Sequence, residues 1–191
     1  YSEHQFFKQW FPETPNFKQN HPFCNNANSA IRKSLWEQRP YDETLTGLED
    51  LAWARKAMDE GYRVAYAADA VIIHVHNETP AQVHNRFRRE AMAFKFIFPQ
   101  EEFRFRTMIR LFLKNAISDL GQAISDGVLF KEAWSVLWFR WLQFHGTYQG
   151  YRQSGPVTGK LRNVFYYPAE EKVEMKTPER AKPINYGEQG E

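Results

Sequence analysis

Residues 23–77 read FCNNANSAIRKSLWEQRPYDETLTGLEDLAWARKAMDEGYRVAYAADAVIIHVHN. Residues 49–60 carry an apolar stripe at helical spacing, and the Glu49-Asp50 pair lies in the first turn, where carboxylates favour the positive end of the helix dipole. Gly61 is a natural C-terminal stop. Residues 62–67 alternate as a strand, and residues 70–75 form the continuous apolar run typical of a strand buried on both faces. With a short strand at 23–32, this order predicts an α/β fold in which helices cover a partial mixed sheet.

The flanking sequence extends this organisation in both directions. Residues 1–22 read as a loop with one short helical turn, and residues 34–38 as a helical turn. Thr79-Pro80 is a cap followed by proline at the first helical position, so a helix is expected to about residue 98. Further helices are expected at 101–120, with a break at Gly121, and at 129–148. We therefore predict an α/β part at 1–98, a helical region at 99–168 and a disordered, polar tail at 169–191.

The composition bounds the class of protein. The chain has 191 residues, 16% of them aromatic, and a net charge of +2, which is too small to argue for nucleic acid as a partner. Cys24 is the single cysteine, so no intrachain disulfide can form. No signal peptide and no membrane-spanning run are visible. Because the chain begins with Tyr1 and not with Met, we expect a fragment of a longer protein.

The acid pair is the first candidate for chemistry. Glu49 and Asp50 follow a loop and begin a helix, so their carboxylates can face a cleft in a fixed direction. A general base needs a side chain held within hydrogen-bond reach of the proton that it removes. The alternative is that the pair only caps the helix and is solvated.

The His-x-His pair is the second candidate. Residues two apart on a strand point to the same side, and neutral imidazole suits divalent transition metals. His74 and His76 could therefore hold a metal ion, with oxygen ligands from elsewhere. The alternative is a pair of polar side chains satisfied where the strand ends.

Polar and basic side chains near these residues could bind substrate. Asn26 and Asn28 could donate hydrogen bonds to sugar hydroxyls, or could form a turn at a strand edge. Arg86 lies at the start of the helix after the His pair and could neutralise a diphosphate, or could belong to a solvated basic face.

The later helices mix basic and large apolar side chains. Residues 103–117 read FRFRTMIRLFLKNAI, and residues 133–144 read AWSVLWFRWLQF. Basic helices with large apolar faces can lie in a membrane interface. We therefore expect a cytoplasmic protein and hypothesise peripheral attachment at the inner face of the plasma membrane, with packing against the α/β part as the alternative.

The motifs in order resemble a known family. NNANSAIRKSLW, then PYDETLTGLEDLAWARKAMDEGYRVAYAADAVIIHVHN, are similar to the second half of the catalytic domain of family 2 glycosyltransferases, which have the GT-A fold. The bacterial rhamnosyltransferase-like group is the most similar in pattern. The resemblance covers residues 23 to about 98, and GKLRNVFYYP looks like a C-terminal ending of such enzymes.

The resemblance implies roles for individual residues. Asp50, with Glu49 beside it, would deprotonate the acceptor hydroxyl, and His74 or His76 would complete the shell of a divalent metal, Mg or Mn. Substrate contacts would come from Asn26, Asn28, Trp53 and Arg86. The implied reaction is an inverting transfer from a nucleotide-sugar donor to a glycan or lipid-linked acceptor in bacterial polysaccharide assembly.

Two departures from the family pattern limit this expectation. The family's nucleotide-sugar site carries an Asp-x-Asp motif that this sequence lacks, so we expect an incomplete, inactive acceptor-side portion. The family's processive Gln-x-x-Arg-Trp motif becomes Gln82 to Phe87 with an extra residue, which argues against processive synthesis. The alternatives are a non-catalytic interaction domain that retains the scaffold and, more weakly supported, a metal-dependent hydrolase that uses Asp50, His74 and His76.

Overall fold

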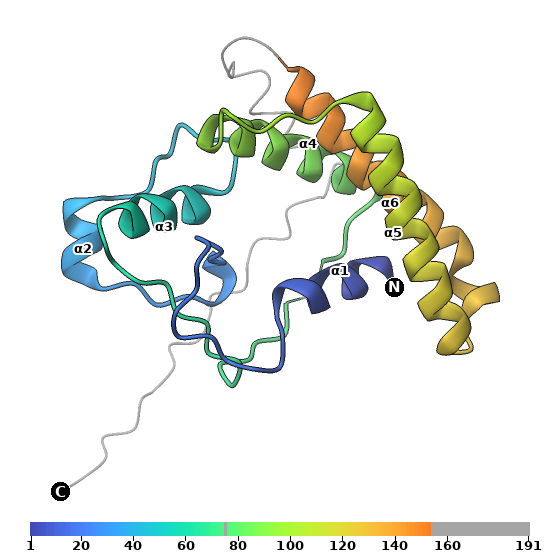
Figure 1. Cartoon of the computed structure of the whole chain (residues 1–191), viewed down its shortest axis with the longest axis horizontal. Helices are drawn as coiled ribbons and strands as arrows, with labels where there is room; N and C mark the ends of the chain where they lie inside the picture. The colour runs from blue at the N-terminus through green and yellow to red at the C-terminus, as the bar shows by residue number, and fades with distance from the viewer. Residues whose placement is uncertain (75, 154–191) are drawn as a thin grey trace, which may run out of the picture.

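The structure is a computed structural model that describes residues 1–74 and 76–153 (Figure 1). In that part, the chain forms one 3₁₀ turn and a set of α-helices. Their bounds are α1 (Ser2–Trp10), η1 (Asn26–Asn28), α2 (Lys33–Gln38), α3 (Glu49–Asp59), α4 (Pro80–Ile97), α5 (Phe105–Ser125) and α6 (Leu129–Arg152). The three long helices α4, α5 and α6 lie together with α1 beside them, while α2 and α3 lie at the other side of the molecule.

The predicted α/β fold with a GT-A-type mixed sheet is wrong. Among the described residues no strand forms, and the only pairing is one antiparallel bridge between Asn16 and Tyr66. The apolar run at 70–74 is exposed where it was expected to be buried, and Ile73 is 92% exposed. A strand needs neighbours for its backbone N–H and C=O groups, and no described segment forms a ladder with this run.

The first expected strand also forms another structure. Within residues 23–32, the side chain of Asn25 accepts a hydrogen bond from the backbone N–H of Ala27 at 2.9 Å. This local bond turns the backbone into η1, because a side chain that mimics a backbone acceptor competes with strand pairing.

The helices are predicted more successfully than the strands. α3 and α4 begin at the expected residues, and α4 is preceded by a capping box. The backbone N–H of Thr79 donates to Oε1 of Gln82 at 2.7 Å, and the backbone N–H of Gln82 donates to Oγ1 of Thr79 at 3.4 Å. The break expected at Gly121 does not occur, because α5 continues to Ser125.

The core of the helical layer lies between α4 and α6. Val83 and Phe87 of α4 pack against Phe139 of α6. Gly146 and Gly150 bring the two helices close together: a Cβ on Gly146 would lie 2.6 Å from the carbonyl oxygen of His84, and one on Gly150 would overlap that of Arg88. Small residues at these two turns of α6 therefore set the spacing of the pair.

α5 packs against a different face of α6, where a buried ion pair joins the two helices. Nε of Arg140 lies 2.7 Å from Oδ2 of Asp119, and Oγ of Ser2 donates to the same oxygen at 2.6 Å. α1 is thereby joined to the α5–α6 hairpin. None of the helices in the described part of the chain is long and apolar enough to cross a bilayer.

α3 is anchored to the helical layer through the loop that precedes it. Leu45 and Ala52 pack against Ile97 of α4. The hydroxyl of Thr46 donates to the carbonyl oxygen of Arg89 at 2.9 Å, and the Arg55 guanidinium bonds the carbonyl of Ile97. These contacts hold the acidic start of α3 at a fixed place relative to α4.

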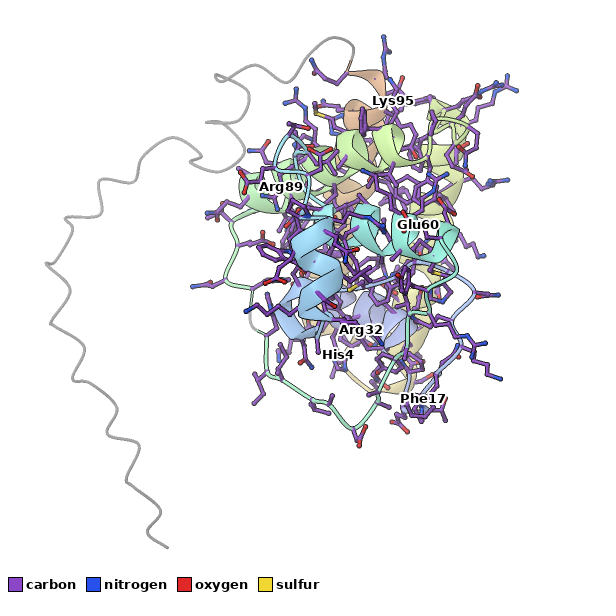
Figure 2. All side chains as sticks on the ribbon, turned by 90° about the vertical axis from the view of Figure 1, so that its left-hand side faces the viewer. His4, Phe17, Arg32, Glu60, Arg89 and Lys95 are labelled. Atoms are coloured by element: carbon purple, nitrogen blue, oxygen red, sulfur yellow. The ribbon has the colours of Figure 1, made fainter. Side chains whose placement is uncertain are left out.

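Figure 2 shows the molecule from the side of α2, with Lys95 of α4 at one end and Phe17 at the opposite end. The boundary expected near residue 98 falls between α4 and α5. The boundary at residue 168, the motif GKLRNVFYYP and the tail at 169–191 lie outside the described residues.

Candidate functional site

The start of α3 holds Asp50 in a defined orientation. Oδ2 of Asp50 accepts from the backbone N–H of Asn26 at 2.9 Å, and Oδ1 accepts from the backbone N–H of Leu51 at 2.8 Å. Burial raises the pKa of this carboxyl, the two N–H donors oppose that rise, and the charge of Glu49 adds to it. The carboxylate is therefore half-buried, oriented and more basic than an ordinary aspartate.

The backbone in front of this helix is strained. Leu48 has a φ of 57°, in the left-handed region that bulky side chains rarely occupy. Such a conformation costs about 1–3 kcal/mol and persists only where the surroundings hold it. The strain lies directly before Glu49 and Asp50, which is the kind of place where a fold fixes a reactive side chain.

Four further side chains complete what we call the acidic turn, which comprises Cys24, Asn26, Tyr41, Glu49 and Asp50. The Tyr41 hydroxyl donates to Oδ1 of Asn26 at 2.7 Å, and Nδ2 of Asn26 donates to Oε1 of Glu49 at 3.5 Å. Burial and then the charge of Asp50 raise the pKa of Cys24. The thiol is therefore held in its neutral form beside the carboxylates.

Trp53 packs against Tyr41 of the acidic turn. Its indole N–H donates to the carbonyl oxygen of Arg39 at 2.6 Å, and its ring packs edge-on against Tyr41 with a centroid distance of 6.4 Å. Since Trp53 is buried with Leu35 and Ala57, its observed contact is with Tyr41 and not with an open surface.

Of the His pair, His76 belongs to a second group of polar side chains, the Glu3 cluster, which comprises Glu3, His76, Glu78 and Arg86. Nδ1 of His76 lies 2.9 Å from Oε1 of Glu3. The Arg86 guanidinium lies 2.6 Å from Glu3 and 2.7 Å from Glu78. Burial works against the charge of Arg86, but the hydrogen bonds and charge of Glu78 prevail and raise its pKa.

Two more residues border the Glu3 cluster. His74 is exposed, and its ring packs edge-on against that of His76 with a centroid distance of 4.5 Å. Glu90 follows Arg86 by one turn of α4; burial raises the pKa of its carboxyl, and the charges of Arg86 and Arg89 oppose that rise. The two carboxylates of the cluster and that of Glu90 beside it thus act together on the Arg86 guanidinium.

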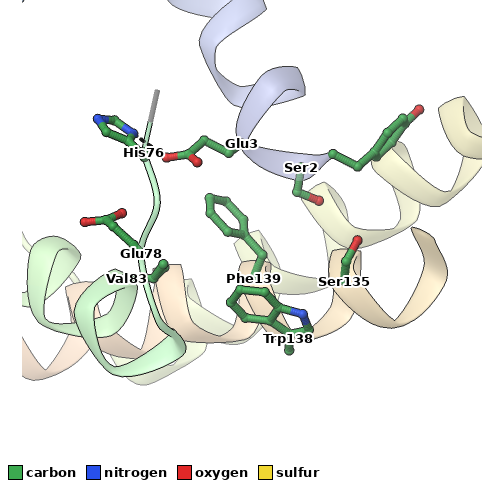
Figure 3. Close-up of a pocket in the computed structure, with 9 residues that line it drawn as sticks. Ser2, Glu3, His76, Glu78, Val83, Ser135, Trp138 and Phe139 are labelled. Atoms are coloured by element: carbon green, nitrogen blue, oxygen red, sulfur yellow. Dashed lines mark hydrogen bonds and ion pairs between the residues drawn. The ribbon is translucent and has the colours of Figure 1, made fainter. Parts of the chain in front are cut away.

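The Glu3 cluster opens onto a pocket of about 140 Å³ between α1, α4 and α6 (Figure 3). Val83, Trp138 and Phe139 form the apolar part of its lining, and the polar part comes from Tyr1, Ser2, Glu3, His76, Glu78 and Ser135. In Figure 3, Glu3 points from α1 toward His76, with Glu78 on the same extended segment as His76. The pocket is small and suits a small polar group or an ion.

Asp50 does not line this pocket. Among the described residues, no hydrogen bond or ion pair joins the acidic turn to the Glu3 cluster. Nδ2 of Asn28 donates to the carbonyl oxygen of Ala70 at 2.6 Å, which ties η1 to the segment that leads to His74. The structure therefore brings Asn26 and Glu49 to Asp50, and His74 and, through Glu3, Arg86 to His76, as two separate groups.

The donor set of the Glu3 cluster partly fits a divalent metal. Glu3, His76 and Glu78 each offer one ligand atom, and these atoms lie within 4.8 Å of one another. Carboxylate oxygens with an imidazole suit Mn²⁺, and carboxylates alone suit Mg²⁺. Arg86 already neutralises both carboxylates, so a metal ion would have to displace its guanidinium.

Two members of this cluster were not predicted from the sequence. Glu78 continues the alternation of His74 and His76, so the spacing His-x-His-x-Glu contains the signal. Glu3 lies on α1, 73 positions before His76, and no local pattern connects them. The contact forms only in the folded chain, where α1 lies against α4 through Phe6 and Phe87 and Glu3 also pairs with Arg86.

The chain is similar over one segment to two curated proteins. It is 38% identical over 66 residues to the O-antigen chain rhamnosyltransferase RfbN of Salmonella typhimurium strain LT2. The matched segment covers 34% of this chain and 21% of that protein. The chain is 35% identical over 66 residues to the O-antigen chain rhamnosyltransferase WbaN of Salmonella anatum, with the same coverage. The matched segment thus spans about a fifth of each relative.

The other comparisons add nothing to this similarity. No protein-family profile matches the chain. No solved structure matches it.

Proposed function

We propose that the chain is the acceptor-side part of an inverting glycosyltransferase in bacterial polysaccharide assembly, related to family 2 by its motifs. It would take part in the transfer of a sugar from a nucleotide-sugar donor to a glycan or lipid-linked acceptor, and rhamnose is the first sugar to test. The observation that carries the proposal is the local similarity to two O-antigen chain rhamnosyltransferases. The geometry of the acidic turn supports it, because it supplies an oriented, half-buried carboxylate.

In the proposed reaction, Asp50 is the general base. The acceptor hydroxyl oxygen bonds to the anomeric carbon as the bond from that carbon to the diphosphate breaks, and the hydroxyl proton passes to the Asp50 carboxylate. A raised pKa strengthens this base and leaves it ionised only while the pH exceeds that pKa. Asn26 orients Asp50 through its backbone N–H, and its side chain is held by Tyr41 and Glu49.

A divalent metal, Mg or Mn, is part of this proposal. When bound, such an ion would neutralise the charge that develops on a leaving diphosphate. His76, Glu3 and Glu78 are the described residues that would hold it, with His74 packed against His76. Arg86, expected to contact a diphosphate, would first have to exchange its two carboxylate partners for the phosphates.

The test replaces Asp50 by asparagine in the full-length protein. Asp50→Asn keeps the size and one acceptor oxygen but removes the base, so transfer of labelled rhamnose should fall about 10²–10⁴-fold. Donor binding, measured by calorimetry, should change little. The control is Asp59→Asn, which alters an exposed carboxylate at the other end of the same helix. Turnover near that of the unmodified protein would remove Asp50 from this role.

A second candidate is a non-catalytic interaction domain. It is favoured by the lack of an Asp-x-Asp motif in these 191 residues. The two candidates differ in one result: an interaction domain would leave the full-length protein equally active with Asp50→Asn, whereas the transferase would lose activity.

A further inference from the structure

The outer face of the α5–α6 hairpin exposes an unusual number of large apolar side chains. On α6 the stripe consists of Phe130, Trp134, Leu137 and Trp141, and on α5 it consists of Leu113, Ile117 and Ile124. Trp134 is 75% exposed and Ile117 is 67% exposed. Single exposed apolar residues are ordinary, but a contiguous patch of them marks a contact surface.

The two stripes lie on the same side of the hairpin. Each recurs at helical spacing, so each occupies one face of its helix. The Asp119–Arg140 ion pair and the edge-on contact of Phe112 with Trp141, at 5.6 Å, fix how the helices are rotated against each other. With this rotation, α4 packs against the opposite side of α6, and the apolar face is left open to solvent.

Basic side chains accompany the apolar face along α5. Arg106, Arg110 and Lys114 follow one another at every fourth position and are all exposed. Within residues 1–74 and 76–153, no ion pair joins any of the three to a carboxylate, whereas Arg104 pairs with Glu102 and Lys131 with Glu132. The surface is therefore apolar at its centre and carries uncompensated positive charge beside it.

We propose that this face of the α5–α6 hairpin docks on the surface of an anionic lipid bilayer. Tryptophan and phenylalanine favour the boundary between headgroups and acyl chains, and arginine and lysine favour anionic headgroups. A second copy of the chain fits less well, because burying two such faces against each other would also bring their like charges together, whereas an anionic bilayer pairs with both the apolar and the basic side chains. The helices would lie on the bilayer, since none of those described can cross it.

The test measures binding of the full-length protein to vesicles of phosphatidylcholine with and without phosphatidylglycerol. Phe130→Ser with Trp134→Ser should weaken binding to the anionic vesicles at least tenfold. The matched control, Phe17→Ser with Trp36→Ser, removes exposed aromatic rings from elsewhere in the chain and should bind within twofold of the unmodified protein.

The charge contribution is tested separately. Arg106→Gln, Arg110→Gln and Lys114→Gln together should weaken binding on the order of a hundredfold, from roughly fivefold per cation near an anionic surface. The control with the same change in net charge replaces three exposed basic residues elsewhere with glutamine: Lys18, Arg32 and Lys33. Because all these positions are exposed, circular dichroism should show unchanged folding.

A third measurement needs no loss of binding. Brominated lipid should quench the tryptophan fluorescence of the unmodified protein, and Trp134→Phe should reduce that quenching while binding persists. Equal binding to neutral vesicles, equal binding by the face variants, or no binding would overturn the proposal. The proposal would also be overturned if the protein formed a dimer that dissociates in both the Phe130/Trp134 double variant and the Arg106/Arg110/Lys114 triple variant. None of these measurements involves sugar transfer, so membrane docking is tested independently of the proposed reaction.

Discussion

The guanidinium of Arg140 on α6 and the carboxylate of Asp119 on α5 form a bidentate ion pair that is almost completely removed from solvent. Nε lies 2.7 Å from Oδ2 and Nη2 lies 3.0 Å from Oδ1, while Nη1 donates to Oε1 of Gln143 at 2.8 Å. The side chain of Arg140 is 1% exposed and that of Asp119 is 5% exposed. A buried charge of this kind is tolerated only while its partner remains.

Asp119→Ala should therefore be strongly destabilising. It leaves the Arg140 charge buried without a carboxylate and removes the acceptor of the Ser2 hydroxyl, so we expect a loss of about 3–5 kcal/mol in the free energy of unfolding. Urea denaturation measures this loss. Glu37→Ala, which breaks an exposed pair with Lys33, is the control and should have little effect. A small loss for Asp119→Ala would show that water reaches Arg140.

Alanine in place of glycine should have opposite effects on α5 and α6. Gly146→Ala or Gly150→Ala introduces a methyl group against the backbone of α4, and such overpacking costs about 1–3 kcal/mol. Gly121→Ala has open space around its Cβ and should stabilise α5 by about 0.5–1 kcal/mol. Thermal unfolding of the three variants checks both signs. A neutral result at Gly146 and Gly150 would contradict the close approach of α4 and α6.

Local signals predicted the helices because the causes of those helices are local. Thr79, Pro80 and Gln82 together specify where α4 begins, and all three can be read from neighbouring positions. The prediction failed at Gly121 because an isolated exposed glycine costs only about 1 kcal/mol in a helix. Packing of Ala116 and Ala123, both buried, outweighs that cost.

The sheet could not be predicted correctly because a strand is not a local structure. The apolar run that ends at Ile73 has the composition of a buried strand, but composition does not supply a pairing partner. The same limit applies to the site. Asp50 and Asn26 were both named as candidates, yet their hydrogen bond spans 24 positions. Glu3 was missed because its contact with His76 spans 73.

Stability should fall on mild acidification through His84. Burial lowers the pKa of this imidazole, and the neighbouring His145 and Arg88 lower it further. The unfolded chain therefore takes up a proton first as the pH falls below the ordinary value of about 6.5, and stability declines from there downward.

His84→Gln should make the melting temperature less dependent on pH between about 7.5 and 5.5, because glutamine does not titrate. The measurement is thermal unfolding at several pH values. His4→Gln, at an exposed position of α1, is the control and should keep the dependence of the unmodified protein. An unchanged slope in His84→Gln would assign the acid sensitivity to other groups.

Arg86 and a divalent metal ion should compete for the same carboxylates. In the structure the guanidinium lies 2.6 Å from Glu3 and 2.7 Å from Glu78, so it takes the position that a cation between them would occupy. Arg86→Gln leaves these carboxylates facing each other with Glu90 nearby, and their repulsion should lower the melting temperature in a chelator. Millimolar Mn²⁺ should restore much of that loss, because a ligand that binds only the folded state stabilises it.

The controls are the unmodified protein, whose melting temperature should rise less with Mn²⁺, and Arg104→Gln, which breaks an exposed pair and should respond like the unmodified protein. If Mn²⁺ raises the melting temperature of none of the three, the Glu3 cluster is an ion-pair network that anchors α1, and the metal ligands of the proposed reaction lie elsewhere.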